Sequence, residues 1–155
     1  MPYISILLAG TPNTPLPQLI YNYLEYGDER TYRCEHCGQV IMQTTFRKLA
    51  EIPDAIPIYI VWQVEDDIGL TPEEVINQRK PLNIRGNLNL QTKHGEAVSY
   101  SLIGGCQHVG SRFSGHYICH LKFRDHFYTG SDADPFFRST EDHVGKCLLY
   151  LYTRI

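Results

Sequence analysis

One histidine of this chain has the surroundings that a general base needs. His116 directly follows Gly115, and the residues after it alternate between apolar and polar side chains, which is typical of a half-buried strand. The alternation predicts a core face with Tyr117, Cys119, Leu121 and Phe123, and an opposite face with His116, Ile118, His120 and Lys122. His116 is therefore expected at the start of a rigid strand, off the core face and beside a glycine-containing loop, where a base is open to a substrate.

A histidine base also needs an acceptor that orients its ring. The segment 127–134, Phe-Tyr-Thr-Gly-Ser-Asp-Ala-Asp, is predicted to return as a hairpin beside the strand of His116 and to bring a polar side chain to it. A structural or surface histidine has the same local signature. These two features alone therefore do not assign a catalytic role.

Cys34 and Cys37 have the spacing of a zinc knuckle, in which a tight turn points both sulfurs at one tetrahedral metal ion. A closed structural site needs four ligands, and the other cysteines are isolated in predicted strands: Cys106, Cys119 and Cys147. Neither His36 nor His94 has a spacing that argues for a nitrogen ligand. We therefore expect an incomplete site, a knuckle that has lost its metal or whose second pair lies on sequence not present here. A redox role is disfavoured because the pair does not open a helix after a strand.

The elements that must position these residues follow from the apolar pattern. We expect strands at 4–8, 32–34, 40–49 and 58–64, a helix from Pro15 behind a Thr14 cap to about Tyr26, and a short helix from the capping box at 71–74 to about residue 78. Residues 58–64 are apolar on both faces, which favours a position inside the sheet. Residues 97–155 are dense in strand signal, so the predicted class is α+β, mainly antiparallel sheet with a few short helices.

Composition excludes several classes of protein. The length of 155 residues is enough for one domain, and the net charge of −3 argues against a sequence-independent nucleic-acid binder. No apolar run approaches the ~18 residues of a membrane span, and the first residues lack the basic leader of a signal peptide. The odd number of cysteines, 5, favours a reducing cytoplasmic or nuclear setting over a disulfide framework. We expect neither nucleic acid nor membrane as a partner.

Further motifs point to a family. The run Gln107-His108-Val109-Gly110, followed by Ser114-Gly115-His116-Tyr117, resembles the histidine box of the ubiquitin-specific proteases, which are papain-like deubiquitinases. The matching features in the family's order are Tyr100-Ser101-Leu102, the histidine box, Phe127-Tyr128, Asp132 and the Leu-Leu-Tyr-Leu-Tyr run at 148–152. Upstream, residues 16–26, Tyr32-x-Cys34-x-x-Cys37, Ile52-Pro53 and the strand at 58–64 resemble the family's fingers and the strand that enters its palm. The resemblance covers nearly the whole chain.

The resemblance implies a cysteine-type deubiquitinase that hydrolyses the isopeptide bond after the C-terminal Gly-Gly of ubiquitin and requires no cofactor for catalysis. It makes His116 the catalytic base and gives the third triad position to Asp132, with Ser131, which strict counting from the aromatic pair favours, as the alternative. The implied substrate-binding residues are His108, Gly110, Gly115 and Tyr117, and the implied metal ligands are Cys34 and Cys37 of the incomplete site. The implied partner is ubiquitin or a ubiquitin-like protein, and a structural zinc is not expected in this chain alone.

Two elements of the family pattern are missing on the same side of the chain: the Asn- and Cys-bearing segment that supplies the nucleophile, and the first CxxC of the fingers. Val-Trp-Gln-Val at 61–64 also replaces the usual Leu-x-Arg-Phe. We therefore expect one partial domain over 1–155, fingers-like at about 30–64 and palm-like at 82–155, that is inactive unless another polypeptide completes it. The alternatives are a non-catalytic pseudo-protease that binds ubiquitin or a ubiquitin-like protein, and a β-rich interaction domain with no link to ubiquitin.

The other cysteines are not expected to replace the nucleophile. Cys119 should face the core, away from His116, whereas Cys106 shares a face with His108 and a contact there is possible. Neither cysteine opens a helix, where a thiolate would be stabilised.

Overall fold

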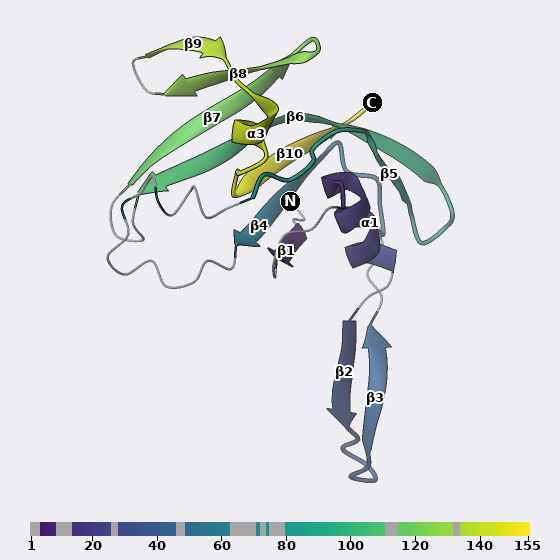
Figure 1. Ribbon diagram of the computed structural model, residues 1–155. Coiled ribbons are helices and arrows are strands. Elements are labelled where there is room, and N and C mark those ends of the chain that lie inside the picture. The colour runs from purple at the N-terminus through teal and green to yellow at the C-terminus, as the bar shows by residue number, and fades with distance from the viewer. Residues whose placement is uncertain are drawn as a thin grey trace.

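The computed structural model describes residues 4–8, 14–25, 28–45, 49–62, 71, 74, 80–110, 115–131 and 134–155. These residues form one large sheet, a separate two-stranded hairpin and two short helices (Figure 1). Most neighbouring strands run antiparallel, so the predicted α+β class with a mainly antiparallel sheet is confirmed.

The large sheet has eight strands. Their order is β1 (Ile4–Leu8), β4 (Ala55–Trp62), β10 (Leu149–Arg154), β6 (Ala97–Gly110), β7 (Gly115–Phe123), β8 (His126–Ser131) and β9 (Asp134–Arg138), and β5 (Leu88–Gln91) also pairs with β6. Among the described pairs of named strands only β1 and β4 are parallel. The strands β6 to β9 follow one another as a meander, whereas β10 returns to lie between β4 and β6. The sequence-distant halves of the sheet therefore meet at β10.

The helix α1 (Leu16–Glu25) covers the part of the core near β1 and β5 (Figure 1). Leu16, Ile20 and Leu24 recur every four residues along it and are buried, as the helical spacing predicted. Its first turn is fixed by the backbone amide of Leu16, which donates to the carbonyl of Asn83 at 2.7 Å. The observed bounds lie within one residue of those predicted.

The strand β4 lies inside the sheet, as the apolar run at 58–64 predicted, but only one of its faces is buried. Ile58 and Ile60 belong to the core, whereas Tyr59 and Val61 on the other face are 41% and 47% exposed. The prediction of an interior strand is therefore confirmed, although the apolar residues of its second face are exposed. Residues 63 and 64 lie outside the described part of the chain.

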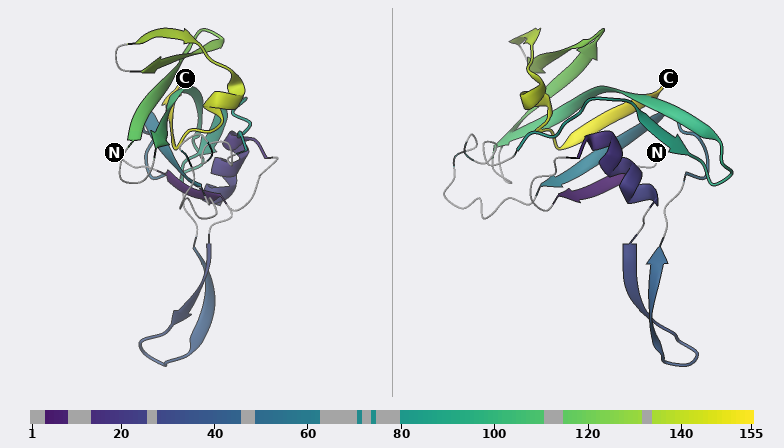
Figure 2. Two further views of the ribbon diagram at one scale, coloured as in Figure 1. Left: turned by 60° about the vertical axis from the view of Figure 1, so that its left-hand side comes forward. Right: turned by 45° about the vertical axis from the view of Figure 1, so that its right-hand side comes forward.

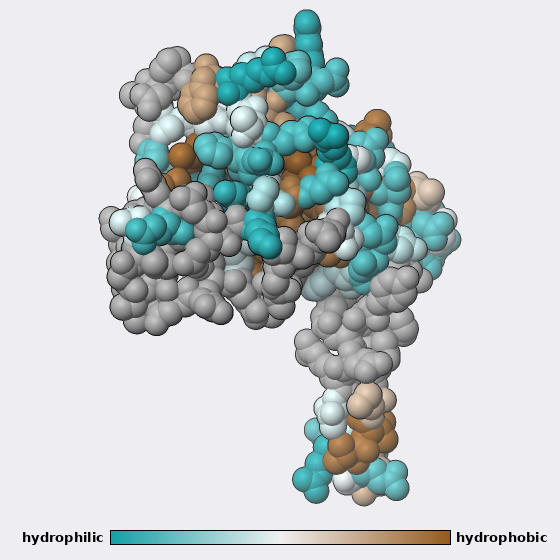
Figure 3. Space-filling view, in the orientation of Figure 1, coloured by the Kyte–Doolittle hydropathy of each residue, from teal (hydrophilic) through white to brown (hydrophobic). Residues whose placement is uncertain are grey.

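The hairpin of β2 (Asp28–Arg33) and β3 (Val40–Thr45) projects away from the body of the sheet (Figures 1 and 2). Its turn holds the Cys34–Cys37 knuckle, closed by the amide of Gly38, which donates to the carbonyl of Cys34 at 2.8 Å. Gly38 has φ +70°, a conformation that favours glycine. Apolar side chains are exposed around the end of this hairpin (Figure 3): Tyr32, Val40, Ile41 and Met42.

The short helices differ in how well the sequence predicted them. The capping box at 71–74 is confirmed: the amide of Glu74 donates to Thr71 Oγ1 at 3.2 Å, and the amide of Thr71 donates to Glu74 Oε2 at 3.3 Å. The other residues of that expected helix lie outside the described part. The helix α3 (Glu141–Val144), capped by Thr140, was not predicted. No described helix is long and apolar enough to cross a membrane.

Two fully buried tyrosines on β10 differ in their hydrogen bonds and give a matched pair of variants. The hydroxyl of Tyr150 donates to the carbonyl of Val144 at 2.6 Å and accepts from the amide of Cys147 at 3.2 Å. The hydroxyl of Tyr152 is buried without a hydrogen-bond partner among the described residues. Tyr150→Phe is therefore expected to lower the free energy of unfolding by about 2 kcal/mol, and Tyr152→Phe to raise it by about 1 kcal/mol.

Urea unfolding of both variants at neutral pH measures these two changes, and each variant is the control for the other. A loss of stability in Tyr152→Phe would show that this hydroxyl has a favourable partner. Equal effects of the two variants would contradict the assignment of the hydrogen bonds to Tyr150.

Candidate functional site

His116 is the second residue of β7, and its side chain is exposed. In the register of these strands Gly110 pairs with Gly115 and Val109 pairs with His116. On the other side of β7, Cys119 pairs with Gly130, so the next residue of β8, Ser131, lies diagonally across from His116 on the same face. The imidazole Nε2 of His116 is in hydrogen-bond contact with Ser131 Oγ.

The structure describes only one of the two residues that were expected to orient the ring of His116. Ser131, the alternative favoured by strict counting from the aromatic pair, is in contact with the His116 ring. Asp132, the first choice, lies outside the described residues. A serine hydroxyl can fix the direction of an imidazole through a hydrogen bond, but it lacks the charge with which a carboxylate stabilises an imidazolium.

The four residues expected to bind substrate come together at the same end of the β6–β7 hairpin. Gly110 pairs with Gly115, and His108 pairs with Tyr117 with their ring centroids 4.9 Å apart. A Cβ atom on Gly115 would overlap the imidazole of His108, so the observed position of this ring depends on the missing side chain at Gly115. The histidine box therefore brings His108, Tyr117 and the bare backbone of Gly115 together on one face of the hairpin end, and His116 on the opposite face.

The side chains of β7 alternate as predicted, but the expected core face is exposed, and on the opposite face His120 is buried and Ile118 is half-buried. Tyr117, Leu121 and Phe123 are 62%, 48% and 64% exposed, and Cys119 on the same face is exposed as well. His120, on the face of His116, is fully buried. The prediction that Cys119 faces the core was therefore wrong. The reason is that α3 lies on the side of the sheet that carries His120, with the ring centroids of His143 and His120 6.5 Å apart.

The buried hydrogen-bond network around His120 was not predicted from the sequence. Its Nε2 donates to Gln107 Oε1 at 3.2 Å, and its Nδ1 accepts from the hydroxyl of Thr129 at 2.8 Å. Burial, and then the charge of His143, lowers the pKa of His120 to about 4, so the ring is neutral at physiological pH. The sequence predicted only that His120 shares a strand face with His116. Alternation assigns side chains to a face but does not show which of them a neighbouring element covers.

All five cysteines lie in the described part of the chain, and none shares a strand face with His116. Cys106 and Cys119 face each other on the opposite side of the β6–β7 ladder, and Cys147 is buried. Cys34 and Cys37 lie in the turn of the projecting hairpin (Figure 1). The sheet therefore does not place a thiol of its own beside the exposed imidazole.

The knuckle has some of the chemistry of a metal site but too few ligands. Hydrogen bonds from the backbone and thiol of Cys37 and from the backbone of His36 lower the pKa of Cys34, which favours the thiolate that zinc binds. A structural zinc site needs four ligands, and the described residues contain no group of three His, Cys, Asp or Glu side chains that could hold a metal. The described residues therefore do not fit a closed zinc site.

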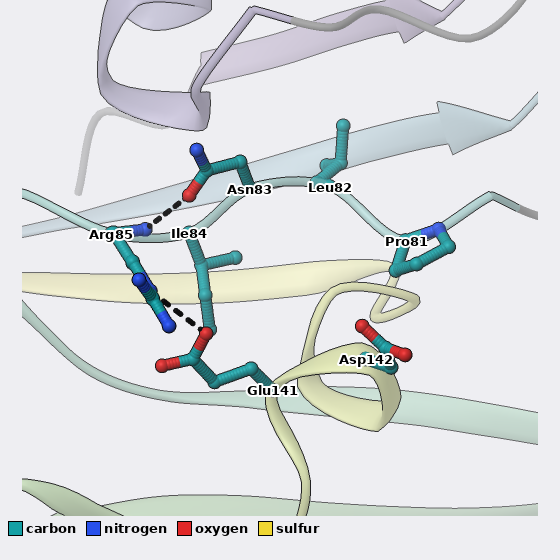
Figure 4. Close-up of a pocket in the computed structure, with 7 residues that line it drawn as sticks. All are labelled: Pro81, Leu82, Asn83, Ile84, Arg85, Glu141 and Asp142. Atoms are coloured by element: carbon teal, nitrogen blue, oxygen red, sulfur yellow. Dashed lines mark hydrogen bonds and ion pairs between the residues drawn. The ribbon is translucent and has the colours of Figure 1, made fainter.

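A separate pocket of about 280 Å³ lies between residues 81–85 and α3 (Figure 4). Arg85 Nε lies 2.9 Å from Glu141 Oε2, and the amide of Arg85 donates to Asn83 Oδ1 at 3.1 Å. Arg85 and Glu141 of this pocket are exposed and paired with each other, and none of the predicted site residues lines it. Its role is therefore distinct from that of the histidine box.

The sequence matches no protein-family model and no curated protein. Solved structures do match. A chain of the SAGA Ubp8/Sgf11/Sus1/Sgf73 DUB module bound to ubiquitin aldehyde is 17% identical to this chain, with a TM-score of 0.55. A chain of the SAGA DUB module bound to monoubiquitin is 18% identical, with a TM-score of 0.57. Each alignment covers 98% of this chain and 35% of the other. A chain of the yeast SAGA DUB module with a mutant Sgf73 is 17% identical with a TM-score of 0.59, over 99% of this chain and 34% of the other.

This likeness is one of fold. Nearly all of the chain aligns, so the sheet, the projecting hairpin and the helices are arranged as in part of these DUB-module chains. The chain spans about a third of the length of the chains it matches. The activity and partners of those longer proteins therefore enter only as a proposal.

Proposed function

We propose that this chain is the fingers-and-palm part of a ubiquitin-specific-protease-like thiol isopeptidase, and that His116 is its general base. The observation that carries the proposal is the contact between His116 Nε2 and Ser131 Oγ at the exposed end of β7. An exposed histidine oriented by a neighbouring strand is the arrangement that a base requires. The proposal is supported by the fold likeness to chains of DUB modules bound to monoubiquitin or ubiquitin aldehyde.

The proposed chemistry is hydrolysis of the bond that follows the C-terminal Gly-Gly of ubiquitin. His116 would take the proton of an attacking thiol and return it to the leaving amine, while Ser131 or Asp132 holds the ring. Because Nε2 contacts Ser131, the proton would pass through Nδ1. The imidazole of His108 fills the space beside the bare backbone of Gly115, so the absence of a side chain at Gly115 holds this ring at the end of the hairpin, where the tail of glycines is proposed to bind.

The thiol for this reaction has to come from outside these 155 residues. The register of the sheet puts Cys106 and Cys119 on the face opposite His116, and Cys147 is fully buried. The isolated chain is therefore proposed to be inactive. The same arrangement favours a second candidate, a pseudo-protease that binds ubiquitin or a ubiquitin-like protein. A protein that only binds does not need a carboxylate to stabilise an imidazolium, and the His116 ring contacts the uncharged hydroxyl of Ser131.

A binding experiment tests the part common to both candidates. Titration of fluorescently labelled ubiquitin with the chain is expected to saturate, and Gly115→Val is expected to weaken binding about tenfold because its side chain would displace the imidazole of His108. Lys122→Ala is the matched control, since Lys122 is exposed near the other end of β7. Ubiquitin without its last two glycines should bind more weakly to the wild-type chain and should be insensitive to Gly115→Val. Absence of saturable binding would remove both candidates.

A ubiquitin probe with a C-terminal electrophile separates a chain with its own nucleophile from one without. We expect no covalent adduct with the isolated chain, because the sheet places no cysteine on the His116 face. An adduct that disappears in Cys119→Ser or Cys106→Ser would overturn this expectation. Adduct formation on the polypeptide that supplies the thiol, lost in His116→Ala but kept in Lys122→Ala, would favour the isopeptidase over the pseudo-protease.

A further inference from the structure

Two cysteines that the proposed reaction does not use face each other across the β6–β7 ladder. Cys106 and Cys119 are direct partners in the antiparallel register, and their Sγ atoms are 3.4 Å apart. Directly opposed residues of antiparallel strands have Cα atoms about 4.5 or 5.5 Å apart, and both separations lie within the range that a disulfide spans. A small rotation of the two side chains is therefore enough to bring the sulfurs to bonding distance.

We propose that Cys106 and Cys119 form a redox-active dithiol that peroxides convert to an intrachain disulfide. The two sulfurs differ in access: Cys119 is exposed, whereas Cys106 is partly covered. Cys119 is thus the sulfur that meets a dissolved oxidant, and Cys106 is the neighbour that resolves the product.

The reaction proceeds in two balanced steps. The thiolate of Cys119 attacks one oxygen of the peroxide, the O–O bond breaks, and with one proton the products are a sulfenic acid and water when the oxidant is hydrogen peroxide. Cys106 then attacks the sulfur of that sulfenic acid, the S–S bond forms, the S–O bond breaks, and hydroxide leaves with the proton of the Cys106 thiol as a second water. Both sulfurs are oxidised and the peroxide is reduced.

The surroundings of Cys106 suit the resolving role. Burial, the hydrogen bond with Cys119 and the charge of Cys119 raise the pKa of Cys106 to about 11, so this sulfur is protected from direct oxidation as a thiol and loses its proton only as it attacks the sulfenic acid. A thiol held 3.4 Å from the oxidised partner needs no diffusion to react with it.

The disulfide would close a loop that contains the histidine box but not Ser131. His108, Gly115 and His116 all lie between Cys106 and Cys119 in the sequence, at the end of the same hairpin. A covalent link at this position would hold β6 and β7 together next to the two imidazoles. Oxidation would therefore stiffen the end of the hairpin without altering any residue of the site itself.

The experiment uses the full chain with Cys34→Ser and Cys37→Ser, so that the exposed knuckle cannot react. After treatment with hydrogen peroxide, we expect the intact mass to fall by two hydrogens, peptide mapping to show the Cys106–Cys119 link, and dithiothreitol to restore both thiols. Cys147 is the internal control, because it is fully buried and should stay reduced. The melting temperature of the oxidised chain should rise by about 5 °C.

Two single variants make the order of steps testable. In Cys106→Ser the sulfenic acid on Cys119 should persist and be trapped by dimedone, whereas in Cys119→Ser no adduct should form at Cys106. The proposal is overturned if both thiols of the parent chain remain free to alkylate after oxidation. Disulfide-linked dimers through Cys119, or oxidation of Cys119 to a sulfinic acid with Cys106 still reduced, would overturn it as well.

Discussion

Gly104→Ala is expected to lower the free energy of unfolding by about 3 kcal/mol, the largest loss we predict for a single methyl group in this chain. The added Cβ would meet the backbone carbonyl of His120 on the neighbouring strand, with the carbonyl carbon only 3.4 Å away. Backbone atoms in the middle of a sheet cannot move aside without lengthening the ladder hydrogen bonds. The whole β6–β7 pairing would therefore carry the strain.

The close approach at Gly104 arises from an irregularity in β6. The register between β10 and β6 shifts by one residue, so that Leu151 pairs with Gly104 and Tyr152 pairs with Leu102. Ile103 is the extra residue of this bulge, and a bulge bends its strand and increases its twist. The bend presses the α-carbon of Gly104 against β7, and only glycine fits there.

Gly130→Ala is the matched control for this prediction. An added Cβ at Gly130 would also overlap a neighbour, but that neighbour is the ring of Phe136, which is 59% exposed and can turn away. We expect a loss of about 1 kcal/mol or less. Urea unfolding followed by circular dichroism measures both variants, and equal losses would contradict the argument that backbone and side-chain overlaps differ.

Acid is expected to destabilise the fold through His120. The folded-state pKa of this ring is lowered to about 4, against an unfolded value near 6.5, so the unfolded chain binds the proton first as the pH falls. The stabilising contribution of the neutral ring is complete above about pH 6.5 and is lost between about pH 6.5 and pH 4. The loss amounts to about 3 kcal/mol.

Two variants isolate this effect from other titrating groups. His120→Gln cannot take up a proton, so the slope of stability against pH between pH 6.5 and pH 4 should flatten, although the variant is less stable at pH 7. His143→Gln removes the second cause of the lowered pKa and should reduce the slope only in part. Unfolding free energies from urea titrations at several pH values measure the slopes, and an unchanged slope in His120→Gln would refute the assignment.

Both predictions concern the middle of β7, where the sequence predicted the two strand faces but not which of them is buried. The alternation of residues after Gly115 was sufficient to divide the strand into two faces, because side chains in a strand alternate whatever packs on them. Which face is buried depends on the neighbouring elements. Here α3, whose four residues are too few for a periodic signal, lies on the side of His120 and leaves the aromatic side exposed.

The candidate site shows the same limit. The order of motifs was enough to place His108, Gly115 and His116 together, because a tight hairpin forces such neighbours to meet. The choice between Ser131 and Asp132 depended on a shift of one residue in the return strand, and β8 and β9 indeed have a register shift between Thr129 and Ser131. Such irregularities are set by local twist and packing, which a single sequence does not encode in its periodicity.

The position of β10 has a consequence for how the chain folds during synthesis. β10 follows all other described strands in the sequence, yet it lies between β4 and β6 and forms the link between β1–β4 and the meander of β6 to β9. On the ribosome, β1 and β4 can pair with each other long before β10 emerges, while the edge of β4 that β10 later covers stays open and the meander can pair only with itself. The two halves of the sheet become one cooperative unit only when Leu149–Arg154 has left the exit tunnel.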